Sequence, residues 1–189
     1  MRFGTTRSNA RAAAAFGVVA VRRGLPLDSV DILPTITTAT VDPSEEEHTA
    51  VASASATLGV ETEAWVDALP DPEAVARLTD IATMTGALCI SEGMEGRTTQ
   101  DGGQEAAIYK LYLIARVLEH EDPEERKNWI MQRVKDALVI LEQDGEAAWD
   151  RVRLELEQRS HLTGEEVRTL IAESDATLSE SGSRTAGDV

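Results

Sequence analysis

The sequence predicts a mainly α-helical protein with a small β element near residues 28–42. Hydrophobic residues make up 42% of the chain but aromatic residues only 4%, so the core has to be built from Ala, Leu, Val and Ile, which favours close-packed helices. From residue 104 onward, apolar residues recur with helical spacing. Val, Ile and Thr gather instead around Pro34, a composition typical of a bent strand, an edge strand or two short strands.

The first third of the chain is expected to hold one long helix and weaker elements. The Ala-rich segment from about Asn9 to Arg23 favours a helix, and Gly24 is a typical stop signal behind it. We interpret Glu45–Leu58 as a loosely packed helix, because it has few large apolar residues. A short helix over Glu61–Leu69 carries Trp65 and ends before the break at residues 70–72.

Longer helices are predicted after this break. One runs from about Pro72 to Glu95 and is followed by a polar, glycine-rich loop at 96–103. The next covers Gln104–His120, and Asp122 caps another that starts at Pro123. The apolar stripes that we expect to face the core are Ile108, Leu111, Tyr112, Ala115 and Leu118 in the first of these, and Ile130, Val134, Ala137, Leu138 and Leu141 in the second.

The C-terminal part is predicted to contain two further helices and a tail. Gly145 interrupts the chain before a helix that turns Trp149, Val152 and Leu156 toward the core. Thr163 and Glu166 have the spacing of a capping box at the start of the last helix. The expected organisation is therefore a frayed N-terminus at 1–8, one helical domain at 9–174, and a disordered acidic and polar tail at 175–189.

The net charge of −16, from 34 acidic and 18 basic residues, argues against two classes of partner. The negative electrostatic potential of such a chain repels both nucleic-acid phosphates and anionic lipid surfaces. No apolar run reaches the roughly 18 residues that cross a bilayer, so we expect no membrane insertion. The chain also lacks a phosphate-binding G-x-x-x-x-G-K-[ST] loop and a typical signal peptide. We expect a cytoplasmic protein without an ATPase module.

Three stretches, in this order, resemble one known family. Residues 18–34 read VVAVRRGLPLDSVDILP, residues 82–96 read ATMTGALCISEGMEG, and residues 162–170 read LTGEEVRTL. The segment 133–172 that contains the last stretch is expected to form a helix, a break and a second helix before this ending. Together they resemble the peptidase domain of the FtsH-type, membrane-AAA zinc proteases, over roughly two thirds of the chain.

The same resemblance implies that the catalytic chemistry is missing. In the family, an H-E-A-G-H run stands just before the V-V-A, and when it is laid on residues 12–16 its two His fall on Ala12 and Phe16 and its Glu on Ala13. The third ligand, an Asp, falls on Ala107, although a small shift would place Glu105 or Asp101 there. Methyl and phenyl groups cannot bind zinc or accept a proton, so these positions are degenerate.

Other residues offer only weak alternatives for a site. His48, His120 and His161 are scattered and do not pair at ligand spacing, and isolated His residues are most often surface or capping groups. Cys89, the single cysteine, lies in an apolar context typical of a buried thiol. The acidic clusters at 45–47 and 119–122 are interpreted as solvated faces, because a calcium loop requires alternating acidic residues.

The resulting hypothesis is a catalytically inactive, FtsH-like pseudopeptidase that acts through a protein partner or through homo-oligomers. We expect no metal and no cofactor. Two alternatives stay open at this point: an active zinc peptidase whose ligands are not recognised, and an unrelated acidic helical structural or interaction protein of a phage or plasmid type.

Overall fold

The computed structural model describes residues 6–42, 45–58, 62–93, 103–144 and 146–185. The fold is mainly helical with a small antiparallel sheet, which confirms the predicted fold class. The helices are α1 (Thr6–Arg22), α2 (Thr62–Asp67), α3 (Pro72–Gly93), α4 (Gly103–Val117), α5 (Pro123–Val139), a π-helical turn η1 (Ile140–Asp144), α6 (Glu146–Arg159) and α7 (Gly164–Thr185). The strands are β1 (Leu27–Asp42), β2 (Glu45–Leu58) and β3 (His161–Thr163).

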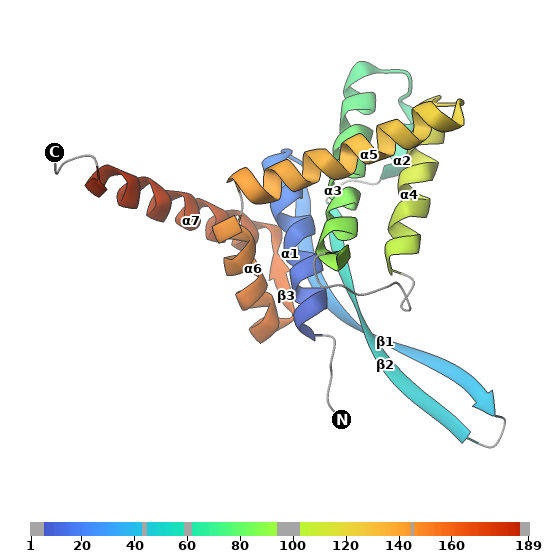
Figure 1. Cartoon of the computed structure of the whole chain (residues 1–189), viewed down its shortest axis with the longest axis horizontal. Helices are drawn as coiled ribbons and strands as arrows, with labels where there is room; N and C mark the ends of the chain where they lie inside the picture. The colour runs from blue at the N-terminus through green and yellow to red at the C-terminus, as the bar shows by residue number, and fades with distance from the viewer. Residues whose placement is uncertain (1–5, 43–44, 59–61, 94–102, 145, 186–189) are drawn as a thin grey trace.

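Helix α1 lies at the centre of the molecule (Figure 1). It packs against α3, α6 and α7 and against both long strands. Every residue from Ala12 to Ala20 is buried, and these residues span more than two helical turns, so all sides of the helix are covered. The indole Nε1 of Trp149 on α6 donates to the Arg11 carbonyl oxygen at 2.8 Å and thereby fixes α6 against the first half of α1.

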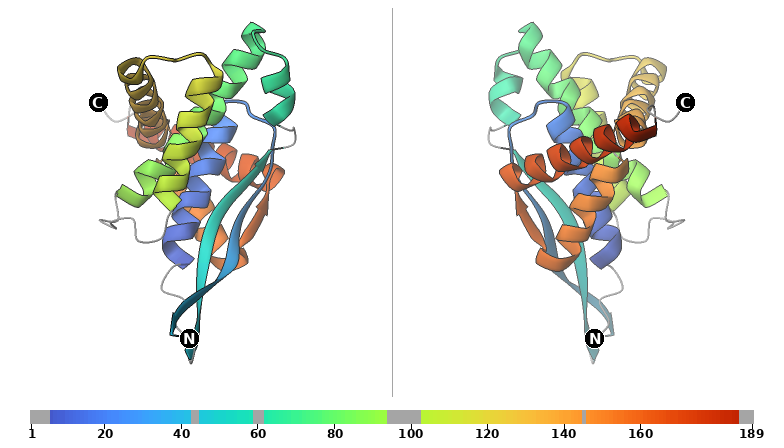
Figure 2. Two further views of the ribbon diagram at one scale, coloured as in Figure 1. Left: turned by 90° about the vertical axis from the view of Figure 1, so that its right-hand side faces the viewer. Right: turned by 90° about the vertical axis from the view of Figure 1, so that its left-hand side faces the viewer.

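The sheet has the strand order β2-β1-β3, and both pairings are antiparallel. Strand β3 pairs with β1 only over Ser29–Asp31, whereas β2 pairs with β1 along nearly its whole length. The hairpin of β1 and β2 therefore extends well beyond the helices (Figures 1 and 2). Our expectation of a loosely packed helix at Glu45–Leu58 is wrong, because this segment gains its backbone hydrogen bonds from β1.

Local signals in the sequence place several helix ends correctly. Gly24 follows α1 with φ of +65°, a conformation that glycine adopts without strain. Asp122 accepts hydrogen bonds from Glu124 N and Glu125 N, both at 2.9 Å, so it is the predicted cap of the helix that begins at Pro123. Trp149, Val152 and Leu156 are buried in the core as expected.

The last helix differs from its prediction. Helix α7 continues to Thr185 and thus covers most of the range 175–189, for which we expected a disordered tail. Asp175, where that tail should begin, receives two hydrogen bonds from Arg22 on α1, at 2.6 and 2.8 Å. These bonds lower the pKa of the Asp175 carboxyl, and they bind α7 to α1. Residues 1–5, in the predicted frayed N-terminus, lie outside the described residues.

The junction of β3 and α7 requires a glycine for steric reasons. A Cβ at Gly164 would lie 1.8 Å from the carbonyl oxygen of Leu27 and 2.6 Å from its carbonyl carbon. Both are backbone atoms at the start of β1, so they cannot turn away as a flexible side chain would. The start of α7 can therefore approach β1 only while residue 164 has no side chain.

We expect Gly164→Ala to lower the free energy of unfolding by about 1–3 kcal/mol, the usual cost of forcing extra atoms into a packed site. Urea denaturation followed by circular dichroism measures this loss. The control is Glu165→Ala, at the neighbouring exposed position of the same helix, which should change stability by less than about 0.5 kcal/mol. Equal effects of the two substitutions would contradict the close approach of α7 to β1.

Candidate functional site

The positions that the resemblance assigns to the zinc-binding motif lie inside the core. Ala12 is 4% exposed, Ala13 is fully buried and Phe16 is 9% exposed. Ala12 and Phe16 are four residues apart on α1 and therefore share a face of that helix. Phe16 belongs to the main hydrophobic cluster, together with side chains of α3, α6 and the sheet. This face holds apolar packing and presents no group that could bind a metal or move a proton.

Ala107, the predicted fourth position, lies on a different helix. It is 4% exposed on α4, and the main neighbours of α4 are α3 and α5. The structure thus groups Ala12, Ala13 and Phe16 on α1 and places Ala107 among the contacts of α3 and α5. The alternative positions Glu105 and Asp101 have no described side chains.

The polar residues considered as substitutes do not form a metal centre in the described part of the chain, where no three His, Cys, Asp or Glu side chains come together. His120 packs its ring against Trp129, with 5.3 Å between the ring centroids. Cys89 is half-buried, so it is less enclosed than we expected. The side chain of His48 lies outside the described residues.

His161 takes part in a cluster that the sequence did not predict. Its Nδ1 lies 2.6 Å from Asp31 Oδ1, and Ser29 Oγ donates to Asp31 Oδ2 at 2.7 Å. In a nucleophilic triad the histidine stands between the serine and the acid, because the imidazole has to take the hydroxyl proton. Here the acid stands between them. The arrangement therefore links β1 to β3 at the paired positions Asp31 and His161 and does not activate Ser29.

A partly buried cluster of charges around Asp80 joins the end of α1 to α3. Burial raises the pKa of Asp80 on α3, and the nearby guanidinium groups of Arg23, Arg77 and Arg133 oppose this shift. Arg23, directly after α1, forms an ion pair with Asp80 at 3.7 Å. Arg77 donates to the Gly24 carbonyl oxygen at 3.0 Å. The carboxylate of Asp80 thus already serves as the anion of this arginine cluster, whose role is to hold α1 against α3.

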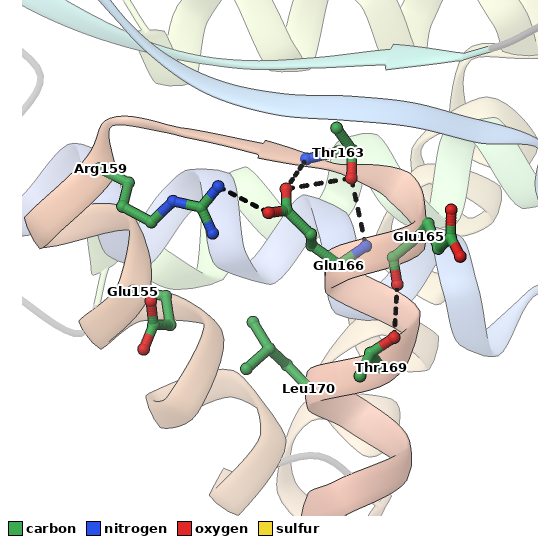
Figure 3. Close-up of a pocket in the computed structure, with 7 residues that line it drawn as sticks. All are labelled: Glu155, Arg159, Thr163, Glu165, Glu166, Thr169 and Leu170. Carbon is green, nitrogen blue, oxygen red and sulfur yellow. Dashed lines mark hydrogen bonds and ion pairs between the residues drawn. The ribbon is translucent and has the colours of Figure 1, made fainter.

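A pocket of about 290 Å³ lies between α6 and the start of α7. Figure 3 shows that Arg159, Thr163 and Glu166 turn toward one another, and Leu170 is the apolar residue of the lining. Glu166 Oε2 accepts hydrogen bonds from Thr163 N at 2.8 Å and from Thr163 Oγ1 at 3.0 Å. Thr163 Oγ1 in turn accepts from Glu166 N at 3.2 Å, which completes the predicted capping box.

Arg159 closes the other side of this pocket. Its Nη2 donates to Glu166 Oε1 at 2.6 Å. The hydrogen bond from the Thr163 backbone, with those from Arg159 and the Thr163 hydroxyl, lowers the pKa of Glu166 to about 2. Arg159 and Glu166 are thus bound to each other and to the helix cap, so this pair has a structural role.

Helix α4 carries the most unusual surface of the described chain. Its buried face consists of Ala107, Leu111, Ile114 and Ala115. The opposite side exposes Ile108, Tyr109, Tyr112, Leu113 and Val117, each between 38% and 64% accessible. We call these five residues the α4 stripe. The prediction that Ile108 and Tyr112 face the core is wrong, because α3 and α5 cover the other apolar face of this helix.

A signal for this surface was present in the sequence. From Ala107 to Val117, only Lys110 and Arg116 are charged, and apolar or aromatic residues occur on every side of the helix. A helix that is apolar all round is normally buried on all sides. On α4 one side remains open in the structure, which makes it the strongest candidate for a binding surface.

Comparison with models of known protein families and with curated proteins gives no match for this chain. Any function has to be argued from the core positions on α1 and from the α4 stripe. None of the helices in the described segments is long and apolar enough to cross a membrane.

We expect Phe16→Ala to destabilise the protein by about 3–5 kcal/mol, because removal of a buried phenyl ring leaves a cavity among small, rigidly placed neighbours. Chemical denaturation measures the change. Val66→Ala is the control, since Val66 is 37% exposed on α2 and its loss should cost little. A near-zero effect of Phe16→Ala would contradict the burial of α1.

The capping box should make stability depend on pH in the acid range. The folded-state pKa of Glu166 is about 2, below its usual value of 4.5, so the unfolded chain binds the proton first. The carboxylate stabilises the fold fully above pH 4.5, and this contribution is lost as the pH falls through about 2.

Glu166→Gln should therefore melt at a lower temperature than the unchanged protein at neutral pH, and the gap should narrow between pH 4.5 and about 2. Scanning calorimetry at several pH values measures the gap. Glu165→Gln, whose side chain lies outside the capping box, should show no such convergence. A gap for Glu166→Gln that stays constant with pH would contradict the proposed role of the carboxylate.

Proposed function

We propose that this protein is a non-catalytic relative of the FtsH-type peptidases, a pseudopeptidase that acts in the cytoplasm by binding another protein. The observation that carries the proposal is the closure of α1. A catalytic zinc site needs three protein ligands and a fourth position open to water and substrate. At the matching positions, α1 has buried methyl and phenyl groups, and the segment around them is covered on all sides.

The order of the elements supports the family assignment within this proposal. Helix α1 is followed by the Gly24 turn and strand β1, as the resemblance implies for the first stretch. Helix α5, the η1 turn and α6 follow each other as a helix, a break and a second helix, and the L-T-G-E-E sequence forms the capping box of α7. Each of these features is local and is weak evidence when taken alone. Their agreement in order along the chain is stronger support for the family assignment than any one of them.

The binding part of the proposal has separate support. The α4 stripe exposes apolar and aromatic side chains side by side on one helix, and such surfaces mark sites of association. This observation also fits an acidic helical interaction protein without any peptidase ancestry. The pseudopeptidase and the acidic interaction protein share the binding role and differ only in their evolutionary origin. An active zinc peptidase differs from both because it would hold a metal ion.

The metal therefore provides the test. Purified protein should contain no stoichiometric zinc, and its melting temperature should not change when a chelator is added, because no part of the folding free energy comes from metal ligation. It should also fail to hydrolyse casein when zinc is supplied. Elemental analysis, thermal melts and a protease assay make these measurements.

The non-catalytic assignment would be overturned if the purified protein held one tightly bound zinc ion and hydrolysed casein in a reaction that a chelator abolishes and added zinc restores. At least one ligand would then come from residues outside the described part of the chain, since the described residues alone do not form a cluster of metal-binding side chains.

A further inference from the structure

We propose that the α4 stripe binds an amphipathic helix of a partner protein, and that acidic side chains border the apolar face of that helix. This inference deepens the binding role proposed above, and it does not depend on whether the protein is catalytic. It rests on the exposed side chains of α4, on the fixed position of Tyr112 and on the charges beside them.

The spacing of the α4 stripe suits a helix as its partner. Ile108 and Tyr112 are four residues apart, as are Tyr109, Leu113 and Val117. Residues at this spacing form ridges along a helix surface, and the ridges of one helix pack into the grooves of another. A partner with apolar anchors at i, i+3, i+4 and i+7 would cover the stripe in the way that amphipathic helices occupy apolar surfaces.

Tyr112 is held in place before any partner arrives. Arg126 on α5 donates from Nη1 to the Tyr112 hydroxyl at 2.7 Å, and its Cζ lies 4.6 Å from the centre of the Tyr112 ring. The same guanidinium donates to the carbonyl oxygens of His120 and Glu121, at 2.9 and 2.8 Å. Arg126 is thus fixed by the turn between α4 and α5. A rigid tyrosine loses little freedom on association, which favours binding.

From Ala107 to Val117, the charges on this side of α4 have the opposite sign to the protein as a whole, whereas Glu105, one turn earlier on the same helix, is acidic and falls on the same side by helical spacing. With 100° between successive residues, Arg116 falls between Tyr112 and Tyr109 within the stripe, and Lys110 falls at its edge beyond Val117. Both cations are exposed, and no acidic residue occurs from Ala107 to Val117. Within the described residues, neither cation makes an ion pair. A partner with carboxylates beside its apolar anchors would supply the missing counter-charges.

The net charge of −16 does not cancel the local preference of α4 for a partner with carboxylates. A helix is about 10 Å wide, close to the roughly 8 Å over which salt screens charges in physiological solution. The partner helix is therefore affected mainly by the positive charges of Arg116 and Lys110. An anionic membrane is a flat surface and would also meet the exposed acids Glu119 and Glu121 at the end of α4. A second copy docked stripe to stripe would place cations against cations.

The test uses two synthetic peptides, each a labelled amphipathic helix about five turns long. Both carry Leu at the same i, i+3, i+4 and i+7 positions. In one, Glu residues flank the apolar face, and in the other, Lys residues do. We expect the full-length protein to bind the Glu peptide at least about tenfold more tightly than the Lys peptide in fluorescence anisotropy titrations, with a preference that salt weakens.

Surface variants connect this binding to α4. The double variant Tyr109→Ser, Leu113→Ser should weaken binding of the Glu peptide by about tenfold or more. Arg116→Glu should weaken the Glu peptide and strengthen the Lys peptide. The matched controls are Leu154→Ser, at a comparably exposed apolar position on α6, and Lys135→Glu on α5. Both should leave the two affinities unchanged, and circular dichroism checks that every variant is folded.

The proposal is overturned if the Glu peptide does not bind, or if the α4 variants bind it as well as the controls do. Sedimentation showing a dimer that Leu113→Ser dissociates would assign the stripe to a second copy. Binding to phosphatidylglycerol vesicles, lost in the same variant and without a peptide preference, would assign it to a membrane. Zinc-dependent hydrolysis by the same preparation would overturn the non-catalytic function and leave the peptide result standing.

Discussion

The structure depends on the complete burial of α1. Five alanines of this helix, at positions 10, 13, 14, 15 and 20, are fully buried, and their small side chains let α3, α6, α7 and the sheet approach it closely. The helix is buried on every side, and a buried polar group without a partner would cost free energy. The identity of the residues at positions 12, 13 and 16 follows from this environment. A helix enclosed in this way serves as the core of the fold.

The elements that were correctly predicted are those fixed by neighbours in the sequence. Asp122 caps α5 through amides two and three residues ahead, and Thr163 and Glu166 satisfy each other within one turn. The failures are non-local. Residues 45–58 carry small side chains that fit a helix or a strand equally well, and only their pairing with β1 decides between the two. Likewise, α7 continues past residue 174 where Asp175 meets Arg22, a residue more than 150 positions away.

The candidate site also has one feature that the sequence predicts and one that depends on contacts distant in the sequence. The loss of metal-binding side chains at positions 12 and 16 is readable from the sequence, because residue type alone decides it. The α4 stripe is readable only in part, because the sequence shows that α4 is apolar on two faces but periodicity cannot tell which face meets α3 and α5. Here the structure reverses the expected orientation at Ile108 and Tyr112. The polar clusters around Asp31, Asp80 and Glu166 each join two elements, so the charged groups of the interior and its rim are used for cohesion.

The contact between Trp149 and Arg11 has a consequence for the protein during its synthesis. The two residues are 138 positions apart, so the ribosome has to add most of the chain before α6 can cover α1. At roughly 5–20 residues per second, the delay is about 7–28 s. Throughout this time the central helix α1 has only part of its final surroundings. The nascent chain therefore has a long interval in which chaperones can recognise it, and a protein stalled before α6 would expose its central helix.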